Sequence, residues 1–168
     1  MGVHQHRKAA PPSVRLGILT VSSTRRLEND ESGRWMIRLA RKEGHANPFH
    51  QVVTDDLETI REAALTAIRH HALQALIVTG GTGITPQDVT IEAIEPLFVK
   101  KMSAFGALFA QLSYEEIDSA AILSRASAGV VGDTVVFCIP GSKKACQLAC
   151  KALIFPDLGH IVAHVRPS

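Results

Sequence analysis

Short runs rich in β-branched apolar residues alternate with longer amphipathic stretches through the first 98 residues. Such a run predicts a buried strand, and apolar residues that recur every three or four positions predict a helix. Strands are expected at 14–21, 49–53 and 74–80, and helices at 31–44, 57–72 and 88–98. Strands and helices that alternate in this way form a parallel sheet covered by helices on both faces. The sequence therefore predicts a three-layer α/β domain with a mostly parallel sheet.

Individual residues predict where several of these helices begin and end. Gly44 is expected to stop the first helix, because glycine readily adopts the backbone conformation that follows a helix. Asp56 is expected to cap the start of the second helix, and His70-His71 to lie at its end. Pro96 is expected to bend or end the third helix, since proline lacks a backbone N–H.

The C-terminal part of the chain departs from this alternation. A helical stretch over 102–124 is expected to break near Gly106 and Ser113. A small β-hairpin follows, with a tight turn at Gly132-Asp133. Helices are then expected at 143–155 and at 157–165.

Composition is that of a globular protein, with 46% hydrophobic and 20% charged residues. No linker or internal repeat appears, so we expect a flexible N-terminal arm over 1–13 and a single domain over 14–168. A net charge of +2 gives no argument for a nucleic-acid partner. No apolar run approaches the roughly 20 residues of a membrane span, and the N-terminus lacks the apolar core of a signal peptide. A cytoplasmic protein is therefore expected, with neither nucleic acid nor membrane among its partners.

Three cysteines, Cys138, Cys146 and Cys150, form no disulfide framework, since their number is odd. Cys146 and Cys150 are four residues apart and would share one helix face. A metal site would need further ligands beside them, whereas lysines surround this pair. We expect all three to act as small buried hydrophobic residues.

The stretch TGGTG (79–83) begins at the end of the strand expected at 74–80 and continues beyond it. In open α/β sheets ligands bind beyond the carboxyl ends of the strands, which is where this loop would lie. Successive backbone N–H groups in a glycine-rich loop can surround an anion, so Gly80, Gly81, Thr82 and Gly83 are candidates to hold a phosphate or pyrophosphate. The stretch matches neither the P-loop nor the dinucleotide-binding pattern. Alternatively, the loop is only a tight turn between strand and helix.

Asp88 follows the glycine loop, and an acid beside an anion site requires a bridging cation. Mg²⁺ has this role in many proteins, held by one or two carboxylates and the substrate's phosphates. Asp55 lies just after the strand at 49–53 and is expected at the same sheet edge, so the two acids could converge. The alternative for Asp88 is a helix cap before residues 89–91.

Two further loops are expected at this edge. The first carries Asp30, Ser32 and Gly33 at a helix start, and the second is Pro140-Gly141-Ser142. Capping and turn formation explain each loop taken alone. Four polar or glycine-rich loops at one edge favour a binding site.

Further short motifs follow one another in a fixed order from residue 14 to about residue 160. They are D-x-SG (30–33), TGGTG with Asp88 and T-x-EA (90–93), PLF (96–98), FG (105–106), LSYEEI (112–117), LSRA (123–126), AG (128–129) and PGS (140–142). With these motifs the chain resembles the MoaB/MogA family of molybdenum cofactor biosynthesis proteins, which includes the G domain of gephyrin. PLF and PGS-x-KAC (140–146) make it look closer to MoaB than to MogA.

The resemblance implies an α/β fold that binds molybdopterin, a pterin dithiolene that carries a phosphate. In active members it implies Mg²⁺-dependent transfer of AMP from ATP to that phosphate, with no stable cofactor. Asp55 and Asp88 would be the catalytic acids, with Asp88 also a Mg²⁺ ligand. The substrate-binding residues would be Ser32, Gly33, Thr79, Gly80, Gly81, Thr82, Gly83, Pro140, Gly141 and Ser142. It also implies a homotrimer or homohexamer that hands its product to a molybdate-insertion enzyme.

Two positions depart from the family's pattern. Ala107 stands where members usually have Glu, and Gln87 stands where many have a basic residue. These departures favour the alternative of a catalytically silent molybdopterin-binding oligomer. A further alternative is the related domain of CinA-type proteins, against which LSYEEI and LSRA count. The apolar stretch 105–112 suits a subunit interface or, equally, a core helix.

Overall fold

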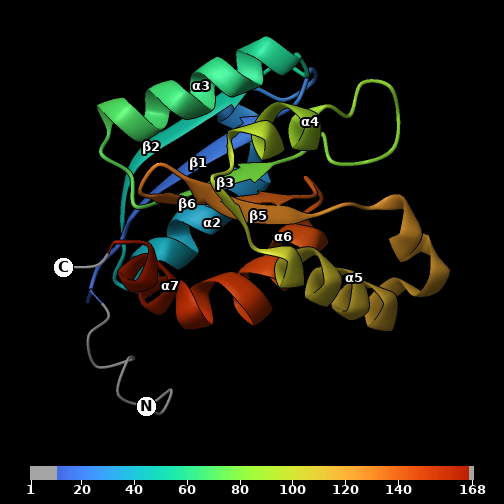
Figure 1. Ribbon diagram of the computed structural model, residues 1–168. Coiled ribbons are helices and arrows are strands. Elements are labelled where there is room, and N and C mark those ends of the chain that lie inside the picture. The colour runs from blue at the N-terminus through green and yellow to red at the C-terminus, as the bar shows by residue number, and fades with distance from the viewer. Residues whose placement is uncertain (1–10, 167–168) are drawn as a thin grey trace.

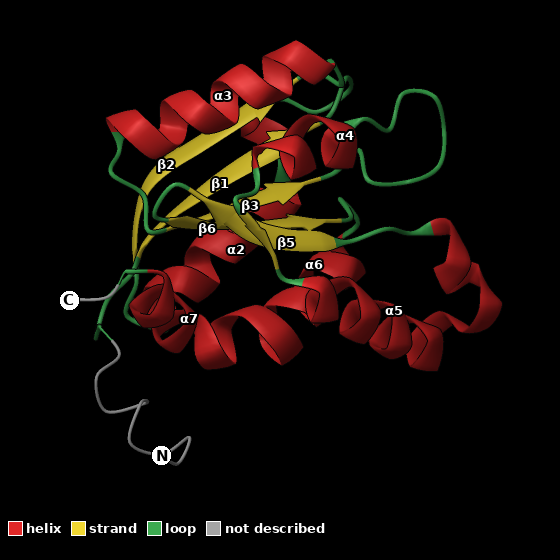
Figure 2. Cartoon of the chain, in the orientation of Figure 1, coloured by secondary structure: helices red, strands yellow, loops and turns green. Residues whose placement is uncertain are grey.

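The computed structural model describes residues 11–166, and most of the arm expected over 1–13 lies outside this range. One six-stranded sheet lies between two layers of helices (Figures 1 and 2). The strands are β1 (Arg15–Val21), β2 (Ala46–Val53), β3 (Ala75–Thr79), β4 (Lys100–Lys101), β5 (Ser127–Val131) and β6 (Thr134–Ile139). The α-helices are α2 (Glu31–Lys42), α3 (Leu57–His70), α4 (Thr90–Ile94), α5 (Ser103–Ile117), α6 (Lys143–Ala149) and α7 (Leu158–Val165). Short helical turns are η1 (Leu27–Asn29), η2 (Glu95–Leu97), η3 (Asp118–Leu123), η4 (Cys150–Ile154) and η5 (Phe155–Asp157).

The strand order is β2-β1-β3-β6-β5-β4. Pairing is parallel from β2 through β1 and β3 to β6, whereas β5 and β4 are antiparallel to their neighbours. The mostly parallel sheet and the hairpin are thus confirmed. The hairpin turns at Gly132, whose φ of +57° is one that glycine adopts without strain.

Two apolar clusters, one on each face of the sheet, form the core. On one face α3 and α4 pack against β1, β3 and β6 through Ile60, Ala64 and Ile94, all at most 1% exposed. On the other face α2, α5, α6 and α7 cover the same strands (Figure 1). Alternate residues of β1, such as Ile18 and Leu19, belong to opposite clusters, as expected for a strand buried on both sides.

The residues expected to delimit helices do so. Asp56 caps α3 by accepting the N–H of Thr59, and α3 ends at His70. Gly44, with a φ of +83°, follows the end of α2. Pro96 lies in the 3-10 turn that directly follows α4.

Three expectations about element bounds are wrong. α5 runs without a break through Gly106 and Ser113, because Gly106 serves close packing: a methyl group there would lie 2.7 Å from the Ala126 carbonyl oxygen. β2 begins three residues earlier than expected and includes Pro48, which an edge strand with a bulge tolerates. The helix expected over 88–98 contains only five α-helical residues, in α4.

The short edge strand β4, made of two exposed lysines, carries no apolar signal and was not expected.

The helical stretch Lys143–Val165 is 23 residues long, and an 18-residue window within it has a mean hydropathy of 1.3, so by length and composition it could span a membrane. The expectation that no apolar run approaches such a length therefore fails for this stretch. One face of it nevertheless lies in the core, through Cys146, Cys150, Ile154, Leu158 and Val162. Because core helices can share this length and composition, the stretch is only a weak indication of a membrane span.

The three cysteines are free and buried, as expected. Burial raises the pKa of the Cys138, Cys146 and Cys150 thiols, so none is activated as a nucleophile. Within residues 11–166 no group of three or more His, Cys, Asp or Glu side chains is arranged to hold a metal ion.

Candidate functional site

The loops that follow β1, β2, β3 and β6 meet at the carboxyl edge of the parallel strands. The Ser23 hydroxyl, after β1, donates to Asp55 Oδ2, after β2, at 2.7 Å. A methyl group on Gly81, after β3, would lie 3.3 Å from Asp55 Oδ1. A methyl group on Gly141, after β6, would lie 3.0 Å from Gly80 Cα. The structure therefore brings together the four loops that the sequence placed at this edge.

The glycine loop is packed closely against the protein itself. Gly80 and Gly81 have φ values of +96° and +63°. A methyl group on Gly81 would lie 2.5 Å from Thr90 Oγ1, and one on Gly80 would overlap the Val21 carbonyl oxygen. The Gly80 N–H donates to the Ile139 carbonyl at 3.0 Å, so it is not among the donors left for an anion. The chain's own packing thus already explains why both positions are glycine.

Arg125 holds the outer part of this loop. Its Nε donates to the carbonyl oxygens of Thr82 and Gly83, each at 3.1 Å, and Nη2 donates to the Asp88 carbonyl at 3.4 Å. Its Nη1 pairs with Glu92 at 2.5 Å, and this pairing raises the pKa of Arg125. The sequence marked this residue only as part of LSRA and assigned it no role, because nothing local shows that it reaches back to the loop.

Asp88 closes the loop on itself. Its Oδ2 accepts both the N–H of Thr85, at 2.9 Å, and the Thr85 hydroxyl, at 2.7 Å. Partial burial alone would raise the pKa of Asp88, but the bonds from Thr85 and the Gly83 N–H, together with the charge of Arg125, lower it, so the carboxylate stays charged. The alternative of a helix cap is wrong, because α4 begins after Val89 with no side-chain cap.

Asp55 and Asp88 lie at opposite ends of the glycine loop, beside Gly81 and Gly83 respectively. Among the described residues no third His, Cys, Asp or Glu joins Asp55 and Asp88. The two acids therefore do not form a complete coordination site for a permanently bound metal ion. Mg²⁺ often binds through one or two carboxylates and takes its other ligands from water and substrate phosphates. Each acid could supply one carboxylate ligand to an ion that arrives together with a phosphate.

Asp30 organises the first loop from below the surface. Its carboxylate is fully buried and accepts from Thr20 Oγ1 at 2.5 Å, His50 Nε2 at 2.9 Å and the Gly33 N–H at 3.0 Å. The last of these bonds caps α2. Burial would raise the pKa of Asp30, but the bonds from His50, Thr20 and Gly33 together lower it.

Replacing Asp30 by asparagine is expected to lower the free energy of unfolding at pH 7 by about 1–3 kcal/mol, the usual cost of a lost charge-assisted bond. A carboxyl whose pKa is lower in the folded state stabilises fully above the unfolded pKa of about 3.9 and loses that contribution as the pH falls through the folded value. The difference between Asp30→Asn and wild type should therefore shrink below about pH 4. Urea unfolding at pH 7 and pH 3 tests this, and a pH-independent difference would contradict it.

Several residues expected to bind substrate also make structural contacts. The Ser32 side chain is buried, and its hydroxyl donates to the Gly141 carbonyl at 3.2 Å. The Thr79 hydroxyl donates to the Pro140 carbonyl at 3.1 Å. Ser142 caps α6 by accepting the Ala145 N–H at 3.2 Å. These contacts fix the loops against one another.

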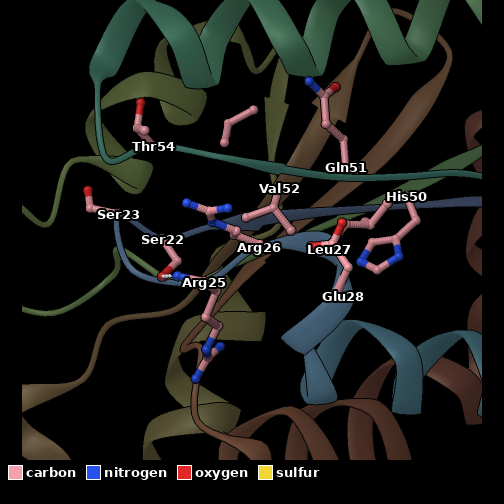
Figure 3. A pocket seen from close by; sticks show the side chains of 11 residues that line it. Ser22, Ser23, Arg25, Arg26, Leu27, Glu28, His50, Gln51, Val52 and Thr54 are labelled. Carbon is pink, nitrogen blue, oxygen red and sulfur yellow. Dashed lines mark hydrogen bonds between the residues drawn. The ribbon is translucent and has the colours of Figure 1, made fainter.

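A depression of about 430 Å³ adjoins Ser23 on the side of the edge strand β2 (Figure 3). The loop after β1 forms one wall and β2 forms the other. Its lining residues are Ser22, Ser23, Arg25, Arg26, Leu27, Glu28, His50, Gln51, Val52, Val53 and Thr54. None of them could be assigned to a site from the sequence, because no motif separates them from ordinary loop and edge-strand residues.

Residues 17–160 match the family model described as "Probable molybdopterin binding domain". The chain belongs to this family of molybdenum cofactor biosynthesis proteins. Molybdenum cofactor biosynthesis protein B of Bacillus subtilis is 44% identical over 167 residues, which cover 99% of this chain and 98% of that protein. The family expected from the short motifs is thus confirmed, and the CinA-type alternative is disfavoured.

Solved structures of the family share the fold. A crystal structure of molybdenum cofactor biosynthesis protein B has a TM-score of 0.89 at 44% identity, covering 93% of this chain and 98% of that one. The tungsten cofactor synthesizing protein MoaB from Pyrococcus furiosus has a TM-score of 0.84 at 36% identity, covering 94% and 99%. Both relatives are MoaB proteins, as the PLF and PGS-x-KAC stretches indicated.

Proposed function

We propose that the chain binds molybdopterin and transfers AMP from MgATP to the terminal phosphate of that pterin. The observation that carries this proposal is the closeness of the Asp55 carboxylate to the glycine loop, since a methyl group on Gly81 would lie 3.3 Å from Asp55 Oδ1. Asp88, at the other end of the loop, is held ionised. A phosphate at the loop would thus have a carboxylate at each end, an arrangement that suits metal-assisted phosphoryl chemistry.

Nucleotidyl transfer needs little covalent chemistry from a protein. It needs the attacking and leaving oxygens to be held in line, and its charge to be neutralised. When bound, Mg²⁺ would supply that neutralisation. Asp55 and Asp88 would hold the ion, while the loops fixed by Arg125 and Ser32 would keep the substrates in position.

A catalytically silent binding protein is the second candidate. Gln87 and Ala107 favour it, because both are exposed and uncharged where the family's pattern has charged residues. Both candidates place the protein in molybdenum cofactor biosynthesis and require the same pterin-binding edge. They differ only in turnover.

A homotrimer or homohexamer, a cytoplasmic location and transfer of product to a molybdate-insertion enzyme complete the proposal. The stretch 105–112 divides between core and surface, since Phe105 and Phe109 are buried whereas Leu108 is 48% exposed. With Leu108, the exposed Ile122 and Leu123 of η3 supply apolar surface that a subunit interface would cover.

The deciding experiment mixes the purified protein with molybdopterin, ATP and Mg²⁺ and detects adenylated pterin and pyrophosphate. Adenylated product that requires all three components is expected. Tight pterin binding without product would instead establish the silent binder. Absence of pterin binding would refute both candidates.

A further inference from the structure

The depression beside Ser23 is bounded by cationic side chains of the loop after β1 (Figure 3). We propose that Arg26, together with Arg25, makes it a subsite for a phosphate group of the substrate, separate from the glycine loop. This inference rests on the proposed function, because it assigns part of the same substrate to a second place at the same edge. The shared chemistry is a phosphate-bearing anion, supplied by the nucleotide or by the pterin.

The arginines at this edge differ in how far their charge is already matched. Arg125 pairs with Glu92 and donates to three carbonyls. Arg25 donates through Nη1 to the Gly141 carbonyl at 3.0 Å, which fixes its position and leaves its charge unpaired. The exposed Arg26 guanidinium has no hydrogen bond or ion pair with any residue in the described range 11–166. Of these three arginines, only Arg26 has its whole guanidinium open to an anion within the described residues.

The surroundings of Arg26 suit a phosphate group. Figure 3 shows its guanidinium beside Val52 and directed toward Thr54, away from Arg25. The Ser22 hydroxyl accepts the backbone N–H of Arg25 at 3.1 Å and so stiffens the loop. A guanidinium binds phosphate through two parallel N–H bonds, which a planar side chain on a fixed loop can provide.

The glycine loop is a poorer place for the whole negative charge of a polyphosphate. Asp55 and Asp88 lie at its two ends, and the Gly80 N–H is already used within the sheet. The Ser23 hydroxyl, bonded to Asp55, lines the depression as well. A ligand could therefore extend from the acids past Ser23 to Arg26, with its metal-bound phosphate at one end and a second phosphate at the other. Glu28, the one acid lining the depression, opposes only part of the two arginines' charge.

The test is calorimetric titration with inorganic pyrophosphate, without metal and at low ionic strength. Arg26→Gln is expected to raise the Kd about tenfold, the effect of losing one exposed charge-assisted contact. It should leave the fold intact, because only the Arg26 backbone is bonded within the chain, to Asn29. Arg38→Gln is the matched control: it removes the same charge from the exposed surface of α2 and should leave the Kd unchanged.

Unchanged pyrophosphate affinity in Arg26→Gln, or no binding to the wild type, would overturn the inference. Two further arms identify the source of the phosphate, namely titrations of both proteins with ATP and with molybdopterin. The ligand whose affinity falls in Arg26→Gln is the one that occupies the subsite. Since binding is measured without turnover, an inactive protein that still binds pyrophosphate through Arg26 would refute adenylyl transfer and retain the subsite.

Discussion

Asp88→Asn is expected to reduce Mg²⁺-dependent AMP transfer about 100-fold or more, since a lost metal contact weakens transition-state stabilisation by several kcal/mol. The fold should persist, because the asparagine side-chain oxygen can still accept the Thr85 N–H and hydroxyl that bond Asp88 Oδ2 at 2.9 and 2.7 Å. What the variant removes is the negative charge. Rates of adenylated-pterin formation at saturating Mg²⁺ measure the effect.

Asp56→Asn is the matched control. Asp56 accepts the N–H and hydroxyl of Thr59 at 2.9 and 2.7 Å, the same pair of bonds that Asp88 accepts from Thr85. Asparagine caps helices about as well as aspartate, so this variant should keep its stability and its rate. A wild-type rate of AMP transfer in Asp88→Asn would show that Asp88 takes no part in the reaction. An equal loss of rate in both variants would show a nonspecific effect of removing a negative charge.

Gly81→Ala is expected to lower the free energy of unfolding by about 3 kcal/mol, through two costs that add. A φ of +63° costs a residue with a side chain roughly 1–2 kcal/mol. The new methyl group would also lie 2.5 Å from Thr90 Oγ1, and overpacking of this kind costs roughly 1–3 kcal/mol. Urea unfolding of variant and wild type gives the difference.

Gly132→Ala separates the two costs. Gly132 has a φ of +57°, close to that of Gly81, but a methyl group there would meet no atom within 4 Å. Gly132→Ala should therefore lower the free energy of unfolding only by the cost of the positive φ, about 1 kcal/mol. Equal losses in the free energy of unfolding at the two positions would mean that the Thr90 side chain moves aside for the new methyl group without an energetic cost. A loss of ligand affinity in Gly81→Ala would reflect a displaced loop, so the role of this loop in binding is better tested at Asp88.

The elements with a strong periodic signal could be predicted from the sequence. β1 and β3 are buried on both faces and appear as continuous apolar runs, and α3 shows both its cap at Asp56 and its end at His70. The elements that were missed or misplaced depend on distant contacts. Gly106 looks like a helix break until the Ala126 carbonyl is seen against it, and Pro48 looks like a strand breaker until β2 is known to be an edge.

The same distinction holds for the candidate site. The glycines, Asp55 and Asp88 could be placed at one edge, because the carboxyl ends of parallel strands coincide. Arg125 could not be placed, since it reaches Thr82 and Gly83 from more than 40 residues further along the chain. The depression lined by Arg26 was also hidden, because its walls are a loop and an edge strand that come together only in the fold.

The order of strands in the sheet determines when this edge comes into being during synthesis. β3 lies between β1, made earlier, and β6, which leaves the ribosome only after α5 and β5. Until β6 docks, Gly80 lacks the Ile139 carbonyl, and Ser32 and Arg25 lack the Gly141 carbonyl to which they donate. A nascent chain that ends before β6 has the glycines and both acids but no assembled edge. Substrate can therefore stabilise only the finished domain, and it cannot assist the earlier steps of folding.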